Sequence, residues 1–224
     1  MLIVLLIVTL LLAGVVMGSG QLAGAKLRKS ATTMAGLIRV SYVRATVQAR
    51  SERIVFDIDN STFWLEESEQ PMLVTSHDTT GTGGAQAVTA AEKAALEEGK
   101  RLVAGPQAPR PAFHAVKPGL YAASDTAGGS ERSLPLGIKF RSVQTGHDEE
   151  PRTSGRAYLY FWPGGMTERA SIVLRKGDST ADTDALTVMV SPLTGNVVTK
   201  AGSVSLPKVE GDKDLSERED KGGI

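Results

Sequence analysis

The stretch that decides the fold is Leu2–Met17, LIVLLIVTLLLAGVVM, a run that is almost wholly aliphatic. Residues 1–25 contain no charged side chain, and the chain continues from Lys26 to Arg50 at helical spacing without a proline. Short strand-like runs separated by turn residues begin only after Arg50. This order predicts an α+β fold, in which a long hydrophobic N-terminal α-helix is followed by a globular head of antiparallel β-sheet arranged as two sheets.

The apolar segment has three interpretations, of which a membrane anchor fits best. A transmembrane helix needs about 20 mostly apolar residues, and Leu2–Ala23 supplies them. A cleavable signal peptide is the second, because Ala23-Gly24-Ala25 has the A-x-A pattern of a cleavage site, but the apolar run exceeds the roughly 7–15 residues of a signal core. A buried core helix is the third, and the apolar character of every face disfavours it. The residues expected to form the anchor are Leu2, Ile3, Leu5, Leu6, Leu10, Leu11, Val15 and Val16.

The charges beside this segment bear on its orientation. Lys26, Arg28 and Lys29 all lie on its C-terminal side, and by the positive-inside rule they place the head in the cytoplasm. Two alternatives follow: the head is cytoplasmic, or the chain lacks its true N-terminus and with it a basic leader. We favour the missing leader.

Residues 26–50 are expected to continue the helix as an amphipathic stalk. Apolar residues recur at steps of three and four on one face, while the opposite face is basic. Because no proline occurs before Pro71, one helix is expected over about residues 2–50, close to 70 Å long. The side chains expected to pack between neighbouring stems are Leu27, Met34, Ile38 and Tyr42. The basic side chains expected on a solvated face at the end of the stalk are Arg39, Arg44, Arg50 and Arg53.

Composition divides the chain into four predicted segments. They are the transmembrane part of the helix at 1–25, the amphipathic stalk at 26–50, the β-rich head at 51–206 and a disordered charged tail at 207–224. An insertion at about 76–133, with a helix over Ala87–Val103, interrupts the head.

Seven strands are predicted in the head outside the insertion. The first two form a hairpin with its turn at Asn60-Ser61. Glycine, proline and aspartate separate the later runs. The predicted strands are Arg53–Asp59, Thr62–Glu66, Leu136–Val143, Arg156–Trp162, Ala170–Lys176, Leu186–Ser191 and Asn196–Lys200.

The composition gives no sign of catalysis or of nucleic-acid binding. Lys plus Arg equals Asp plus Glu, 25 each, so no overall charge favours a nucleic acid or an acidic substrate. Cysteine is absent, which excludes a disulfide framework, a thiolate metal site and a cysteine nucleophile. The G-x-S-x-G elbow of serine hydrolases is also absent. We expect no enzyme activity, no cofactor and no catalytic residue.

Three further patterns in the sequence could in principle bind a metal ion or a phosphate group. The histidines lack metal-ligand spacing and are expected in exposed loops; they are His77, His114 and His147. The glycines of 81–84 lack the Lys-Ser/Thr of a P-loop and are expected to form a linker. Asp178, Asp182 and Asp184 crowd one loop, where calcium is the minor alternative to a solvated turn because the EF-hand spacing is missing. No metal site is expected.

Leu27–Glu66 resembles the region after the anchor in the minor pseudopilins of the GspH/FimT family. In that family a helix with an Arg-Ala-x-Ala-like ending, here at Arg44-Ala45, leads into two strands with a V-x-F-D pattern and a later tryptophan. Two later turns resemble the family's F-x-P-x-G and P-x-T-G segments. The matching positions are Phe56, Asp57, Trp64, Pro163, Gly165, Pro192 and Gly195. The resemblance covers roughly residues 1–75 and 136–202.

The resemblance implies a pilin-like fold and a role in assembly. It implies a type II secretion pseudopilin held in the bacterial inner membrane by one helix, with its head in the periplasm. The implied partners are other pseudopilins of the same filament, inner-membrane lipid and, if the leader exists, the prepilin peptidase; nucleic acid is not expected. The family's basic leader, Gly-Phe cleavage point and following glutamate have no counterpart here, and the insertion at 76–133 is a second departure.

Three alternatives stay open. The first is a type IV pilus minor pilin of the same family, some of which bind DNA. The second is a secreted periplasmic protein, an enzyme included, that is cleaved after Ala25 and begins at Lys26. The third is a signal-anchored periplasmic binding module with no role in assembly.

Overall fold

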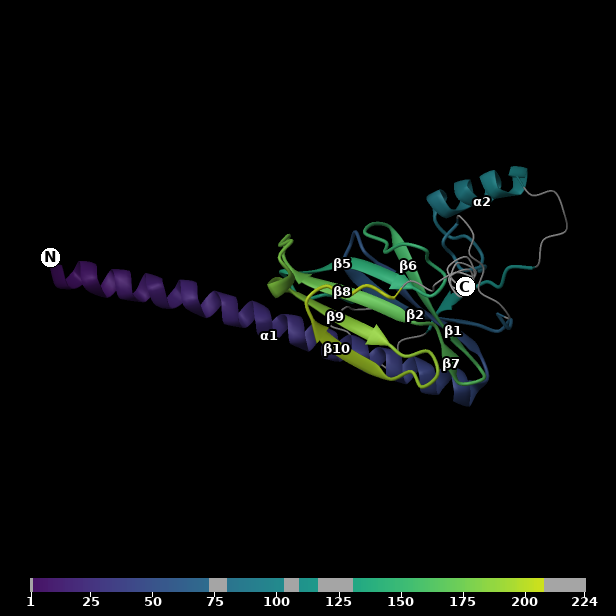
Figure 1. Cartoon of the computed structure of the whole chain (residues 1–224), viewed down its shortest axis with the longest axis horizontal. Coiled ribbons are helices and arrows are strands. Elements are labelled where there is room, and N and C mark those ends of the chain that lie inside the picture. The colour runs from purple at the N-terminus through teal and green to yellow at the C-terminus, as the bar shows by residue number, and fades with distance from the viewer. Residues whose placement is uncertain (1, 73–79, 103–108, 117–130, 208–224) are drawn as a thin grey trace, which may run out of the picture.

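A computed structural model describes residues 2–72, 80–102, 109–116 and 131–207, and it describes side chains in the N-terminal helix at Val4 and from Leu22 onward. Helix α1 runs from Leu2 to Gln48 without a break, as predicted. Its N-terminal half extends away from the head, and its C-terminal half lies along the strands (Figure 1).

The predicted anchor is described only as the backbone of α1. The side chains of the eight anchor residues named above lie outside the described residues, as does the predicted tail apart from Pro207. Over the part of the chain that the structure describes, no helix combines the length and the apolarity that crossing a membrane requires.

The head consists of two antiparallel sheets. The strands of the first are β1 (Ser51–Asp57), β2 (Thr62–Ser68), β3 (His114–Ala115), β4 (Arg132–Ser133), β6 (Arg156–Trp162) and β7 (Met166–Thr167). Those of the second are β5 (Ile138–Thr145), β8 (Ala170–Lys176), β9 (Ala185–Val190) and β10 (Val197–Ala201). The first sheet has the order β3-β2-β1-β6-β7, with β4 also paired to β2, and the second has the order β10-β9-β8-β5. The predicted α+β fold with a two-sheet head is confirmed.

One hydrophobic core lies between α1 and the two sheets. Met34 and Ile38 of α1 belong to the same cluster as Leu159 of the first sheet and Ile172 of the second. Strand β1 shows how alternation divides its side chains between two faces: Phe56 enters this core and Val55 enters a second cluster. Helix α1 is therefore part of the head over its C-terminal half.

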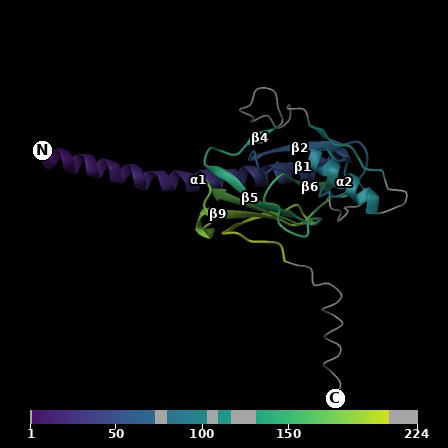
Figure 2. The ribbon, with the colours of Figure 1, turned by 90° about the horizontal axis from the view of Figure 1, so that it is seen from above.

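The second cluster lies on the outer face of the first sheet, where the insertion packs. Its buried members are Val55, Met72, Ala85, Phe113, Tyr158 and Tyr160. Helix α2 (Ala90–Leu102) begins three residues later than predicted and projects from the head in Figure 1. Figure 2 shows from above that it lies at the end of the head away from the N-terminus of α1. Strands β3 and β4, which were not predicted, add the insertion to the β2 edge of the sheet.

Candidate functional site

The described half of α1 has a buried face and an exposed face. Leu27 is 4% exposed, and Met34 and Ile38 are 0% exposed, because both sheets of the same chain cover them. We expected these side chains to pack between neighbouring stems, and the structure corrects that expectation. Over Leu27–Ala45, a neighbouring subunit can therefore reach α1 from its other side.

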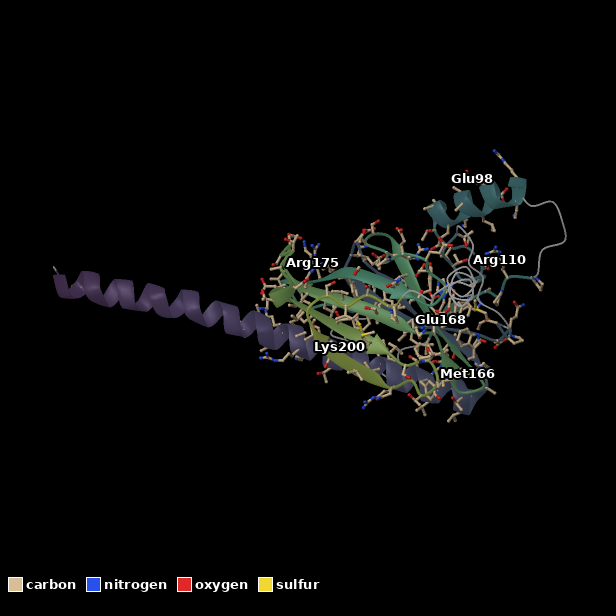
Figure 3. The ribbon with its side chains drawn as sticks, in the orientation of Figure 1. Glu98, Arg110, Met166, Glu168, Arg175 and Lys200 are labelled. Carbon is tan, nitrogen blue, oxygen red and sulfur yellow. The ribbon has the colours of Figure 1, made fainter. Side chains whose placement is uncertain are left out.

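The exposed side of α1 is here called the outer stalk face, and its residues recur mostly at steps of three and four. It consists of Arg28, Lys29, Thr32, Gly36, Arg39, Val43 and Val47. Val43 is 58% exposed and Val47 is 78% exposed, so two branched apolar side chains lie open one turn apart. Met166, which is 50% exposed, lies near the C-terminal end of α1 and extends this apolar area onto β7 (Figure 3).

Tyr42 joins α1 to two turns that lie far apart in the sequence. Its hydroxyl, which has one proton, lies 2.5 Å from the carbonyl oxygen of Gly165 and 3.1 Å from that of Leu193, so it donates mainly to Gly165 and shares the proton with Leu193. The two turns also contact each other, because the Thr167 amide donates to the Pro192 carbonyl at 2.9 Å. Tyr42 was expected to pack between stems, but it fastens the stalk to its own head.

Glycine is required in both turns at the residue nearest Tyr42. Gly165 has φ 76° and Gly195 has φ 60°, a left-handed conformation that disfavours side chains. A Cβ on Gly195 would lie 2.5 Å from the Tyr42 ring. The sequence predicted each turn separately, and the structure brings Pro163, Gly165, Pro192 and Gly195 to the same place on the stalk.

Arg44 is buried between two carboxylates at the end of α1. Its Nε lies 2.5 Å from Glu52, which is fully buried, and its Nη2 pairs with Glu67. Burial raises the pKa of Glu52 to about 7, against the charge of Arg44, which lowers it. The expectation that Arg44 is solvated was wrong, because β1 and β2 bring two acids against it.

Arg53 is also buried, contrary to the expectation of a solvated side chain. It is 1% exposed, and its guanidinium lies 4.4 Å from the ring centres of both Phe113 and Tyr158. Nη2 of Arg53 pairs with Glu66 at 2.6 Å on the neighbouring strand. Phe113 belongs to the insertion, so this stacked cation holds the insertion against the sheet.

Glu92 fixes the start of α2 to the same face. Its carboxylate accepts the amides of Val88 at 2.8 Å and Thr89 at 3.0 Å, and Thr89 Oγ1 accepts the Glu92 amide, which forms a capping box. Tyr158 donates to its other oxygen at 2.5 Å. Burial raises the pKa of Glu92, but these hydrogen bonds outweigh it, so the net pKa is lowered.

The motif residues of the first hairpin have structural contacts. Phe56 is buried edge-on against Phe140 of the second sheet. Asp57 accepts the Asn60 amide at 2.9 Å and so shapes the predicted turn. Trp64 donates from its indole nitrogen to Glu66 at 2.8 Å and stacks under Arg156. Each of these side chains thus makes its contacts within the head.

His147 was expected in an exposed loop, but it is buried. Its Nδ1 lies 2.9 Å from Glu168, which is likewise buried, and its ring lies against Tyr160. Burial lowers the pKa of His147, but the hydrogen bond and charge of Glu168 outweigh it and raise the pKa above its ordinary value. His114 is exposed, as predicted, and His77 lies outside the described residues.

The three aspartates of the β8–β9 loop each pair with a base on the second sheet. Asp178 pairs with Lys139 at 2.8 Å, Asp182 with Arg141 at 2.9 Å and Asp184 with Lys176 at 2.9 Å. Within the described ranges, no three His, Asp or Glu side chains are grouped to hold a metal ion. These carboxylates act in ion pairs, which favours the predicted turn over calcium.

Comparisons with known proteins give a similarity of fold. No protein-family model matches the chain, and no curated protein matches it. One solved structure, of the minor pseudopilin EpsH from the type 2 secretion system of Vibrio cholerae, is 9% identical over 80% of this chain and 97% of that one, with a TM-score of 0.41. A crystal structure of the minor pseudopilin EpsH from the same organism is 11% identical over 81% of this chain and 97% of that one, with a TM-score of 0.44.

Proposed function

We propose that the chain is a minor pseudopilin of a type II secretion system, a structural subunit of the periplasmic pseudopilus that drives protein export across the outer membrane. The observation that carries the proposal is the division of α1 into two halves. The C-terminal half is fixed in the core of the head, and the N-terminal half, with the aliphatic run Leu2–Met17, extends away from it (Figure 1). Such a subunit has a stem that can insert into a membrane or a bundle of stems, and a head that remains outside it.

The junction at Tyr42 supports the same proposal. The turns that carry Pro163 and Pro192 were singled out by resemblance to the pseudopilin family, and both contact this one stalk residue. A stem that transmits position to its head needs a rigid joint, and the Tyr42 hydroxyl, whose proton is shared between the Gly165 and Leu193 carbonyls, contributes to it. The two turns that resemble those of the family thus meet at the connection between stem and head.

The mechanism of the proposed function is assembly. The anchor would hold the subunit in the inner membrane with its head in the periplasm, and would then leave the lipid for contacts with neighbouring stems. Because lipid tails are as apolar as leucine, close packing of small and branched side chains must supply the specificity. Gly14 and Gly18 of the apolar run fit this role by sequence.

Deletion of the gene, followed by complementation, tests the proposal. Loss of protein export into the medium with normal DNA uptake, restored by the wild-type gene, is the expected result. Loss of DNA uptake with normal export would instead establish the type IV pilus minor pilin. Unchanged export and uptake would refute a role in either filament.

The N-terminus of the protein made from its native locus separates the anchored forms from the secreted one. Intact mass and N-terminal peptide sequencing are expected to find an N-methylated residue produced by a prepilin peptidase. A mature protein that begins at Lys26 would mean that the apolar run is a discarded signal. The assembly mechanism would then be wrong, and a secreted protein would take its place.

A further inference from the structure

The outer stalk face has a charge that no described residue of its own chain balances. No Asp or Glu occurs between Met1 and Ser51, whereas six Lys and Arg residues occur there. Arg44 and Arg50 pair with glutamates that follow the helix. Arg39 donates to the neutral Asn196 side chain at 3.3 Å, and Arg28 and Lys29 are exposed without an ion pair to any described residue.

These charges are interleaved with places where a helix can approach closely. Gly36 lies between the two basic levels, and a Cβ there would meet nothing within 4 Å. Val43 and Val47 continue the same face toward the head. Along the helix axis, Arg28 and Arg39 are separated by about 16 Å, or three turns. From its N-terminal to its C-terminal end, the face therefore presents the basic pair Arg28 and Lys29, the open glycine Gly36, the basic Arg39 and the apolar pair Val43 and Val47.

Two copies of this chain would pair poorly with each other through this face. Parallel stems in register would place Arg28 against Arg28 and Arg39 against Arg39, and like charges juxtaposed across an interface are strongly unfavourable. A stem with acidic side chains at those two levels, about 10–11 residues apart, would turn the same contacts favourable. Apolar side chains are required opposite Val43 and Val47.

We propose that the outer stalk face docks the stem helix of a different subunit, one with acidic side chains opposite Arg28–Lys29 and Arg39, and that its charge prevents pairing with a second copy of this chain. The inference rests on the proposed function, which requires that stems pack together. It adds the chemistry of the partner and places the contact on the side of α1 that the head leaves uncovered.

Because the chain contains no cysteine, disulfide cross-linking can test this directly. The full-length chain with Val43→Cys is reconstituted in lipid vesicles, alone and mixed with a copy that also carries Arg28→Glu, Lys29→Glu and Arg39→Glu. Tags of different size distinguish the pairs. The acidic copy serves as the probe for an acidic stem, so the test does not depend on knowing the natural partner.

The mixed disulfide dimer is expected to exceed either self-dimer by at least about threefold, and the excess should fall at high salt because the charges lie at the surface. Val198→Cys on β10, which is 49% exposed, is the matched reporter and should show no such excess. Copies that carry Val43→Cys alone and cross-link to each other as well as to the acidic copy would overturn the inference. So would an unchanged yield in the mixture, in which case the basic residues serve lipid headgroups.

The pseudopilin role and the acidic partner can be refuted separately. Normal export after gene deletion would refute the pseudopilin role without changing the cross-linking result. Absence of the mixed dimer, with export lost on deletion, would refute only the acidic partner. All three reversed residues are exposed, so an unaltered circular dichroism spectrum should accompany the reversed copy.

Discussion

Replacing Arg44 with methionine is expected to destabilise the head more at pH 8 than at pH 5. Arg44 is 9% exposed and contacts Glu52 and Glu67, of which Glu52 is fully buried. Methionine keeps much of the apolar contact of the arginine stem but leaves Glu52 in the core without its cation. The size of the effect therefore depends on whether Glu52 is ionised.

The sign follows from the pKa of Glu52, which burial raises from an ordinary 4.5 to about 7. A carboxyl with a raised pKa binds its proton more tightly in the folded chain. Its contribution to stability is therefore fully present below pH 4.5 and is lost as the pH rises through about 7. The difference between the two pKa values corresponds to about 3 kcal/mol.

Without Arg44, Glu52 must stay protonated in the folded chain even at pH 8, at a cost of about 5 kcal/mol relative to the ionised unfolded chain. That adds about 1.4 kcal/mol to the existing cost, because pH 8 lies one unit above the pKa of about 7, and loss of the partly exposed pair with Glu67 adds about 1 kcal/mol. We expect a loss of about 2 kcal/mol at pH 8. At pH 5, where Glu52 is protonated in both proteins, about 1 kcal/mol is expected.

Urea unfolding of the full-length chain in detergent, followed by the fluorescence of Trp64 and Trp162, measures these losses at both pH values. The double variant Arg44→Met with Glu52→Gln is the control, because it removes the buried acid together with its partner. It should recover most of the loss at pH 8. Equal losses at the two pH values, or no recovery in the double variant, would show that Arg44 acts through packing and that the electrostatic reasoning is wrong.

Three further substitutions test the joints of the head by the same unfolding measurement. Tyr42→Phe removes the hydroxyl that holds two turns and should cost about 1–2 kcal/mol, whereas Thr46→Ala, at an exposed residue one turn away, should cost far less. Gly195→Ala should cost more than Gly177→Ala: both have positive φ, but a Cβ at Gly195 strikes the Tyr42 ring and one at Gly177 meets nothing within 4 Å. Equal costs would mean that the Tyr42 ring moves aside. Tyr158→Phe removes the donor to Oε1 of Glu92 and should cost about 1–2 kcal/mol. It should also speed proteolysis of the insertion, and an unchanged cleavage rate would show that Phe113 and Arg53 hold the insertion without it.

The regular elements of the head were predictable because their patterns are local. Arg156–Trp162 and Ala170–Lys176 were predicted with the bounds that the structure shows, since each run is bordered by glycine, proline or charged turn residues. The helix over 2–48 followed from unbroken helical spacing. Strands β3 and β4 were missed because each contains only two residues.

The buried charges were missed because their partners come from elsewhere in the chain. A period of 3.6 identifies an apolar stripe but does not show whether the stripe meets its own head or a neighbour, so Leu27, Met34 and Ile38 were placed at the wrong contact. For Arg53 the predicted register was wrong. A two-residue turn at Asn60-Ser61 pairs Asp59 with Thr62 and so places Arg53 opposite Ser68, whereas the observed register pairs Asp57 with Thr62 and Arg53 with Glu66. His147 had no local signal either, because Glu168 lies 21 positions away on another segment.

The embedding of α1 in the head determines how the molecule responds to tension. Residues from Leu27 to Ala45 lie along both sheets, and Tyr42 and Arg44 fasten the far end of this contact. A pull along the helix axis therefore loads the buried side chains, the hydroxyl contacts and the ion pairs in parallel, as shear. Contacts loaded in this way must yield together, whereas a helix peeled from its tip gives them up one after another. The stalk is thus mechanically strongest in the direction in which it projects.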